Sequence, residues 1–337
     1  MSKHVIVTGG GGFVGEALCR RLVGLGYRVT SIARGSYPEL ENCGVNVVQH
    51  DLSQPLTSIL PQLEGANAIF HTAAYVKMWG KYQDFYQVNV VATKQLLAAA
   101  KELKIENFIY TSSPSVIADG RDLCGINESY PYPVKHKAFY PQTKAIAEQM
   151  VLAANGQELN TLSLRPHLIW GPGDRNFVPT ILERARAGKL MCIGDGQNKV
   201  DVCYIDDCVT AHIRALEALK ENPKSRGKAY FISQGEPVKL WEWINQILEL
   251  HDLPQITKKV PFGIAYPAAA ILETVSRLMP GQPEPRFTKF LVSEMATDHY
   301  FDLSRAKDLL GFEPKVSIKV AMERTFSSDN RQERVAA

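Results

Sequence analysis

The chain has 337 residues, of which 45% are hydrophobic and 22% are charged, and its formal net charge at pH 7 is +3. These values are typical of a globular protein with one large domain or two smaller ones, and they exclude a disordered low-complexity chain. The small net charge argues against nucleic acid as a partner, and six scattered cysteines without a C-x-x-C pair predict a reduced, cytoplasmic chain without a metal site.

The first predicted element is a short apolar strand at residues 4–7, which leads into a glycine-rich turn at residues 8–15 and then into apolar residues at helical spacing. Gly9 permits the tight turn, Gly12 lets the backbone approach a phosphate, and Gly15 lets the helix lie close to the strand. Backbone N–H groups at the N-terminus of such a helix attract anions. The turn therefore predicts a site for the pyrophosphate of a dinucleotide.

Strand-like and helix-like segments alternate over the first half of the chain. Strands are predicted at 28–32, 45–48, 68–71, 108–111 and 161–164, and helices at 16–25, 89–103 and 140–154. This alternation predicts an α/β fold with a doubly wound parallel sheet of the Rossmann type, which binds ligands at the carboxyl ends of its strands.

The alternation loosens after Pro166, where a turn at 171–174 precedes predicted helices at 176–187 and 241–250. A strand at 228–233 is expected to rejoin the sheet, and the chain from residue 260 onward is interrupted by prolines and helical in pieces. We therefore predict a dinucleotide-binding domain of residues 1–170 and about 200–235, with a smaller, mostly helical C-terminal substrate lobe of about 171–199 and 236–337.

Tyr140 and Lys144 lie four residues apart and so share one face of the predicted helix at 140–154. A lysine ammonium beside a phenol favours the phenolate, so we expect the pKa of Tyr140 to be lowered. Such a tyrosine exchanges a proton with a carbonyl or alcohol oxygen near neutral pH. Thr111, Ser112 and Ser113 end the preceding strand, where their hydroxyls are expected to face the same cleft.

These segments together resemble the extended branch of the short-chain dehydrogenase/reductase superfamily, over nearly the whole chain. The resemblance implies that Ser113, Tyr140 and Lys144 are catalytic and that Asn89 supports the active-site helix. It implies that the nicotinamide passes a hydride to a carbonyl carbon while Tyr140 supplies the proton, and that Lys144 bonds the nicotinamide ribose. The cofactor contacts implied in this way are Thr8, Gly9, Gly12, Phe13, Val14, Gly15, Asp51, Leu52, Ala73, Ala74, Tyr140, Lys144, Pro166 and Ile169.

The end of the second predicted strand distinguishes NAD from NADP. An acidic residue at this point binds the ribose 2′-hydroxyl of NAD, whereas an arginine accommodates the 2′-phosphate of NADP. Here the position of the acidic residue is taken by Ala33, and Arg34 follows it. A guanidinium group binds phosphate through two parallel hydrogen bonds, so the sequence predicts NADP(H) and, with it, reduction as the physiological direction.

Within this branch the chain most resembles the 3β-hydroxysteroid dehydrogenase group, at residues 110–116 and 169–172. Residues 34–40, 111–116, 164–174 and 228–233 are also similar to bacterial reductases of long-chain olefin biosynthesis. This similarity implies NADPH-dependent reduction of a long-chain 2-alkyl-3-oxo acid, which is a β-keto acid, to the 3-hydroxy acid. A 3β-hydroxysteroid or sterol dehydrogenase, a nucleotide-sugar epimerase and a non-catalytic dinucleotide sensor stay open as alternatives.

The predicted substrate contacts are Tyr75, Trp79, Ser113 and His167. Aromatic residues at 75–86 either wall an apolar acyl pocket or pack between the lobes. A substrate carboxylate requires a cationic partner, for which the candidates are Lys77, His136, Lys137, His167 and Arg175.

The apolar stretch at 260–279 is a poor membrane span because it contains Glu273, Arg277 and two prolines. It is expected to pack against the main lobe, with a lid or a membrane-surface helix as alternatives. The expected assembly is a homodimer.

Overall fold

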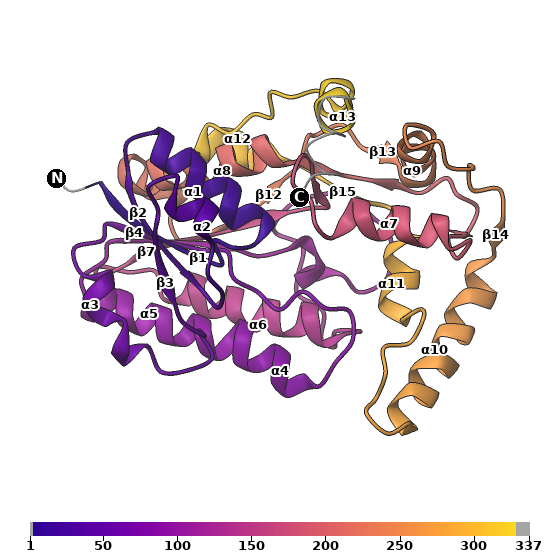
Figure 1. Cartoon of the computed structure of the whole chain (residues 1–337), viewed down its shortest axis with the longest axis horizontal. Coiled ribbons are helices and arrows are strands. Elements are labelled where there is room, and N and C mark those ends of the chain that lie inside the picture. The colour runs from indigo at the N-terminus through magenta and orange to yellow at the C-terminus, as the bar shows by residue number, and fades with distance from the viewer. Residues whose placement is uncertain (1–2, 328–337) are drawn as a thin grey trace.

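The structure, a computed structural model, describes residues 3–327 and is built around a parallel sheet of seven strands (Figure 1). The strands pair in the order β12-β7-β5-β4-β1-β2-β3. They are β1 (His4–Thr8), β2 (Arg28–Ala33), β3 (Asn46–Gln49), β4 (Ala68–His71), β5 (Asn107–Thr111), β7 (Asn160–Pro166) and β12 (Ala229–Ile232). The order reverses between β1 and β4, which is where a doubly wound sheet binds its ligand. The predicted Rossmann-type sheet is therefore confirmed.

Helices cover both faces of the sheet, so its inner strands are buried on two sides, whereas the edge strand β3 is only partly buried (Figure 1). Along β1, Val5 and Val7 belong to the apolar cluster on one face, whereas Ile6 belongs to the cluster on the other face. This alternation follows from the two-residue period of a strand. The first face carries α1 (Phe13–Gly24), α8 (Ile205–Glu221) and α12 (Ser304–Leu310), and the second carries α3 (Leu60–Leu63), α5 (Ala92–Glu102) and α6 (Phe139–Ala153).

Two helices differ from the sequence-based expectation. The long helix α8 was not predicted, because the alternation of strand-like and helix-like segments loosens in the sequence before it. Helix α10 (Phe262–Leu278) is one continuous helix although it contains Pro267. The proline lies in the second turn, so it removes a single backbone hydrogen bond, to the carbonyl oxygen of Gly263.

The remaining elements are short strands and helices, many of them in the C-terminal part of the chain. The strands are β6 (Leu123–Ile126), β10 (Lys199–Val200), β13 (Val238–Lys239) and β15 (His299–Phe301) in one sheet, with the pairs β8 (Ile169–Trp170)–β11 (Cys203–Tyr204) and β9 (Cys192–Ile193)–β14 (Lys259–Val260). The helices are α2 (Pro38–Glu41), α4 (Tyr82–Tyr86), α7 (Phe177–Arg186), α9 (Leu240–Glu249), α11 (Lys289–Glu294) and α13 (Ile318–Phe326). Single turns of 3₁₀-helix lie at Leu56–Ser58, Pro114–Ile117 and Pro223–Ser225.

Helix α10 lies at the edge of the molecule beside α11 (Figure 1). Its inner face buries Ala265 and Ala269, whereas Ile264, Ile271 and Leu278 are exposed. None of the helices within residues 3–327 combines the length and the apolar character that crossing a bilayer requires. The predicted domain boundaries stay a prediction.

Candidate active site

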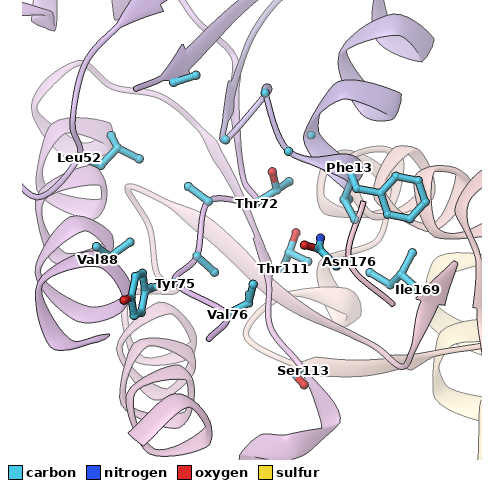
Figure 2. A pocket seen from close by; sticks show the side chains of 18 of the residues that line it. Phe13, Leu52, Thr72, Tyr75, Val76, Val88, Thr111, Ser113, Ile169 and Asn176 are labelled. Carbon is cyan, nitrogen blue, oxygen red and sulfur yellow. The ribbon is translucent and has the colours of Figure 1, made fainter. Parts of the chain in front are cut away.

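A cleft of about 510 Å³ opens at the carboxyl ends of β1, β2, β4, β5 and β7. Figure 2 shows Leu52, Val88 and Tyr75 on one side of it and Phe13 and Ile169 on the other. The predicted site residues that line this cleft are Gly9, Gly12, Phe13, Val14, Gly15, Arg34, Asp51, Leu52, Ala73, Ala74, Tyr75, Ser113, Tyr140, Lys144, Pro166 and Ile169. Four of the predicted residues, Thr8, Trp79, Asn89 and His167, lie outside its lining.

The glycine turn forms one end of the cleft. Gly9 has a φ of +72°, and a Cβ at this position would lie 2.9 Å from Cα of Ala73. A Cβ at Gly15 would lie 2.2 Å from the carbonyl oxygen of Gly9. Gly12 is the N-cap of α1, and no side chain caps this end of the helix. The N–H groups of the first turn are therefore available to an anion in the cleft.

Thr8 supports the turn from below. Its hydroxyl bonds Nδ1 of His71 at 2.7 Å and accepts the N–H of Ala73 at 3.2 Å. His71 in turn bonds the hydroxyl of Thr93 on α5 at 2.9 Å. Burial, together with the nearby charge of Lys144, lowers the pKa of His71 to about 3, so the ring is neutral at neutral pH. This buried chain joins β1, β4 and α5 beneath the turn.

Tyr37 and Arg34 line the cleft next to the carboxyl end of β2. The phenol ring of Tyr37 packs on Gly11, where a Cβ would lie 1.9 Å from its Cζ atom. Arg34 is exposed and lines the cleft together with Asp51. Arg175 comes from the loop after β8 and donates to the carbonyl oxygen of Gly11 at 3.2 Å. Arg175 also pairs with Glu16 at 2.8 Å, so its charge beside the glycine turn is partly neutralised.

Lys144 lies at the other end of the cleft, on the first turns of α6. Its ammonium donates to the carbonyl oxygen of Thr111 at 2.6 Å and lies 4.2 Å from the centre of the Tyr110 ring. Burial lowers the pKa of Lys144 to about 7, although the carboxylate of Glu148 acts in the opposite direction. The lysine is therefore close to half protonated at neutral pH in the absence of a ligand.

Tyr140 shares this end of the cleft with Ser113. The sequence-based expectation that its pKa is lowered is wrong. Burial raises the pKa of Tyr140 to about 12, a hydrogen bond with Ser113 opposes this shift, and the charge of Glu294 adds to it. The cost of desolvating the phenolate thus exceeds the stabilisation that the hydrogen bond with Ser113 provides. The phenol is protonated at neutral pH, which suits a proton donor.

A buried ion pair lies behind Lys144. Arg165 on β7 donates to the carboxylate of Glu148 on α6 at 2.6 Å, and both side chains are almost fully buried. Tyr132 and Ser163 also donate to this carboxylate, at 2.6 and 2.7 Å. Burial alone would raise the pKa of Glu148, but Arg165 and these hydrogen bonds lower it. The network fixes α6, and with it the face that carries Lys144, against the sheet.

Asn89 acts on the same helix from the opposite side. It lies in a turn of π-helix (Gln87–Val91) before α5, where the sequence predicted a regular helix. Its side-chain amide donates to the hydroxyl of Thr143 on α6 at 3.0 Å and accepts the N–H of Tyr75 at 2.8 Å. A π-turn inserts one extra residue into a helix and is common at functional sites. Asn89 thus joins the loop of Tyr75 to α6.

Trp79 and His167 make other contacts. The indole N–H of Trp79 donates to the carbonyl oxygen of Gln282 at 2.9 Å, so it joins the loop after β4 to the segment after α10. His167 is buried, and its Nε2 bonds Nδ1 of His299 at 2.9 Å. Burial lowers the pKa of His167 well below its ordinary value. A neutral ring is a poor partner for a carboxylate.

Sequence reasoning missed Tyr37, Leu168 and Glu294. Tyr37 lies three residues after Arg34, and this closeness in the sequence could have indicated that Tyr37 also lines the cleft. Leu168 lines the cleft with a φ of +42°, a backbone conformation that no sequence pattern announces. Glu294 influences Tyr140 from a distant part of the chain, so only the folded structure reveals it.

Comparison with known proteins agrees with this geometry. Residues 6–261 match the model of the 3-beta hydroxysteroid dehydrogenase/isomerase family. The chain is 44% identical over 334 residues to the 2-alkyl-3-oxoalkanoate reductase of Shewanella oneidensis, a match that covers 97% of this chain and 86% of that protein. It is 35% identical over 341 residues to the human sterol-4-alpha-carboxylate 3-dehydrogenase, decarboxylating, covering 99% of this chain and 90% of that protein.

The fold is also similar to that of solved structures. The UDP-glucuronic acid 4-epimerase from Bacillus cereus, determined in complex with NAD, superposes with a TM-score of 0.72 at 22% identity. The match covers 98% of this chain and 99% of that one. At this identity the likeness concerns the fold alone.

Proposed function

Because the chain belongs to the 3-beta hydroxysteroid dehydrogenase/isomerase family, an oxidoreductase family that depends on a nicotinamide dinucleotide, we propose that it is an NADPH-dependent reductase of long-chain 2-alkyl-3-oxo acids. The observation that carries this proposal is the cleft itself. One continuous cleft holds the glycine turn at one end and Ser113, Tyr140 and Lys144 at the other. We further propose that the reaction belongs to olefin biosynthesis. The cytoplasmic location and the homodimer stay predictions.

The two named relatives support a β-keto acid as the substrate class. In a 2-alkyl-3-oxoalkanoate the carboxylate is attached to the carbon next to the ketone. In a sterol-4-carboxylate that is oxidised at position 3, the carboxylate is again on the neighbouring carbon. The shared feature is an acid group adjacent to the reacting carbon, so the sterol dehydrogenase activity is the second candidate function.

The residues of the cleft fit a dinucleotide. A Cβ at Gly12 would meet only the carbonyl oxygen of Gly9, at 3.2 Å, so the backbone is open toward the cleft. Ser112 lines the cleft, and its hydroxyl is buried without a hydrogen-bond partner among residues 3–327. Arg34, with Ala33 in place of an acidic residue, supports NADP(H) rather than NAD(H).

The chain's own residues then supply the proton and the alignment. When bound, the reduced nicotinamide provides the hydride for the carbonyl carbon. Tyr140 is protonated at neutral pH and donates its proton to the carbonyl oxygen. Ser113 orients that oxygen beside Tyr140, and Lys144 binds the nicotinamide ribose from α6. Asn89 and the Glu148–Arg165 pair hold α6 in place.

NADPH oxidation measured with a 2-alkyl-3-oxo acid, and with a ketosteroid, tests the proposal. Tyr140→Phe is expected to lower the rate of reduction by about 10²- to 10⁴-fold, because it removes the general acid, and to leave NADPH binding nearly unchanged. A variant that stays active contradicts this mechanism. Higher kcat/KM for steroids with NAD would favour the second candidate, and a tightly bound nicotinamide that co-purifies would favour an epimerase.

A further inference from the structure

Helix α10, at the edge of the molecule (Figure 1), has an exposed side that is entirely apolar. This outer face is formed by residues at alternating intervals of four and three, which are Ile264, Ala268, Ile271, Val275 and Leu278. Ile264, Ile271 and Leu278 are 63%, 65% and 82% exposed. The apolar stripe of a surface helix normally faces the core, and a contiguous apolar patch in water marks an interaction site.

The opposite, inner face of α10 is fixed to the protein by polar contacts as well as by packing. Oε1 of Glu273 accepts the backbone N–H of Lys289 at 2.7 Å, and Oε2 lies 3.5 Å from Nζ of the same lysine. The hydroxyl of Ser276 donates to the carbonyl oxygen of Pro283. The helix therefore cannot turn its outer face inward without breaking these contacts.

No charge interrupts the outer face. Glu273 is the only charged residue between residues 260 and 276, and it is buried on the inner face. The hydroxyl of Thr274, at the border of the outer face, donates to the carbonyl oxygen of Ala270 at 2.8 Å, so it is satisfied within the helix. The outer face can therefore enter an apolar medium without leaving a charge or this hydroxyl unpaired.

Basic residues flank the outer face at both ends of α10. Lys258 and Lys259 precede the helix, Arg277 lies in its last turn, and Arg286 follows it. Nζ of Lys259 and the guanidinium group of Arg286 each donate to a backbone carbonyl oxygen, at 2.6 and 3.5 Å, and these contacts leave their charges uncompensated. The only exposed acid within residues 258–286 is Glu284. The partner that fits this surface is thus apolar in the middle and anionic around it.

The C-terminal end of α10 is tied to the mouth of the cleft. The indole N–H of Trp79 donates to a carbonyl oxygen of the segment after α10 at 2.9 Å, and the guanidinium group of Arg277 lies 5.4 Å from the centre of the Trp79 ring. The same guanidinium group lies 5.8 Å from the centre of the Phe139 ring, and Phe139 directly precedes Tyr140. Val76, in the loop of Trp79, lines the cleft and is 50% exposed. The apolar surface therefore ends where the cleft opens.

We propose that the outer face of α10 docks onto the surface of an anionic lipid bilayer. The helix lies in the plane of the bilayer, with the outer face at the boundary between headgroups and acyl chains and the basic residues at the lipid phosphates. A second copy of the chain fits less well. Because both ends of α10 are basic, two copies of the helix would bring like charges together whether they packed parallel or antiparallel. Docking does not depend on which substrate the cleft takes.

Co-sedimentation of the full chain with vesicles tests this proposal. Vesicles of phosphatidylcholine with about 30% phosphatidylglycerol should bind the protein at least about tenfold more tightly than vesicles of phosphatidylcholine alone, and about 0.5 M NaCl should remove most of this difference. The triple variant Ile264→Ser, Ile271→Ser, Leu278→Ser should bind both kinds of vesicle at least about 100-fold more weakly. Leu25→Ser and Val320→Ser change apolar residues that are each 37% exposed outside α10, and they should bind like the wild type.

A second variant tests the charges and leaves the outer face intact. Lys258→Gln combined with Arg286→Gln should weaken binding to the anionic vesicles by about five- to tenfold and leave binding to the neutral vesicles unchanged. Melting temperatures and NADPH titrations that match the wild type should show that the variants are folded, since the substituted side chains are exposed.

Three results overturn the inference. They are a wild-type protein that binds neither kind of vesicle, a triple variant that binds as tightly as the wild type, and self-association in sedimentation velocity that the triple variant abolishes while vesicles are not bound. The last result would assign the outer face to a second copy of the chain. A protein that binds vesicles but reduces no 2-alkyl-3-oxo acid supports the docking surface and contradicts only the proposed function.

Discussion

The ammonium group of Lys144 lies 2.6 Å from the carbonyl oxygen of Thr111 and donates a hydrogen bond to it. The hydroxyl of Thr111 bonds Nε2 of His212 at 2.8 Å, so the end of β5 is held from both sides. This contact keeps Lys144 buried beneath the cleft, and burial lowers its pKa to about 7. The charge of the lysine is therefore sensitive to whatever binds above it.

We predict that dinucleotide binding takes up a proton above neutral pH. Lys144 is mostly neutral at pH 8 in the free protein, and a negatively charged ligand raises its pKa. Affinity should therefore fall by up to about tenfold per pH unit between pH 7 and pH 9. Calorimetric titration in two buffers of different ionisation enthalpy measures the uptake. Lys144→Met should abolish it, and an unchanged uptake in this variant would assign the proton to another group.

Arg34 is predicted to decide between the two nicotinamide dinucleotides. Arg34→Ala removes a charge-assisted contact with the 2′-phosphate, so Kd for NADPH should rise by about 10- to 100-fold while Kd for NADH changes little. Fluorescence titration with both cofactors checks this. Arg175→Ala is the control, since Arg175 lies at the glycine turn and should affect both cofactors alike. Equal losses in Arg34→Ala would remove the argument for NADP.

Two glycines of α1 provide a matched pair of substitutions. A Cβ at Gly15 would lie 2.2 Å from the backbone oxygen of Gly9, whereas a Cβ at Gly24 would meet nothing within 4 Å. Gly15→Ala should lower the free energy of unfolding by about 1–3 kcal/mol and abolish dinucleotide binding, because the turn must move. Gly24→Ala should leave both properties intact or add a few tenths of a kcal/mol of stability. Denaturant unfolding measures the stability of both variants, and cofactor titration measures their dinucleotide binding. If the two variants behaved alike, the turn would tolerate a Cβ at Gly15 and the prediction would be wrong.

Asp201 is predicted to make stability depend on pH. Its Oδ2 accepts hydrogen bonds from Ser233 at 2.8 Å and from the N–H of Phe301 at 3.0 Å, but Oδ1 is buried and has no partner in the described part of the chain. Burial raises the pKa of Asp201 to about 6. Since an unfolded aspartate has a pKa near 3.9, the native state binds this proton more tightly, and its contribution to stability grows as the pH falls through about 6.

The charged Asp201 should cost on the order of 3 kcal/mol at neutral pH. Asp201→Asn cannot titrate, so its change in melting temperature between pH 7.5 and pH 5 should be smaller than that of the wild-type protein. Thermal unfolding of both proteins at the two pH values measures the difference. Identical pH dependence would show that Asp201 stays charged in the native state.

The local patterns of this chain determine much of the fold and the identity of its chemical groups. The glycine spacing, the four-residue interval between Tyr140 and Lys144, and the alternation of apolar strands and helices are short-range features, and they follow from the periods of helix and strand. They suffice for the Rossmann-type sheet, for the pyrophosphate cradle and for a tyrosine–lysine pair on one helix face.

Tertiary structure decided the environment of these groups. The pKa of Tyr140 is raised rather than lowered, because desolvation depends on everything packed around the phenol and not on the spacing of one lysine. His167 is bonded to a histidine of β15, and the charge of Glu294, at the end of α11, raises the pKa of Tyr140. Contacts between such distant residues leave no periodic trace in the sequence, because only long-range packing brings them together.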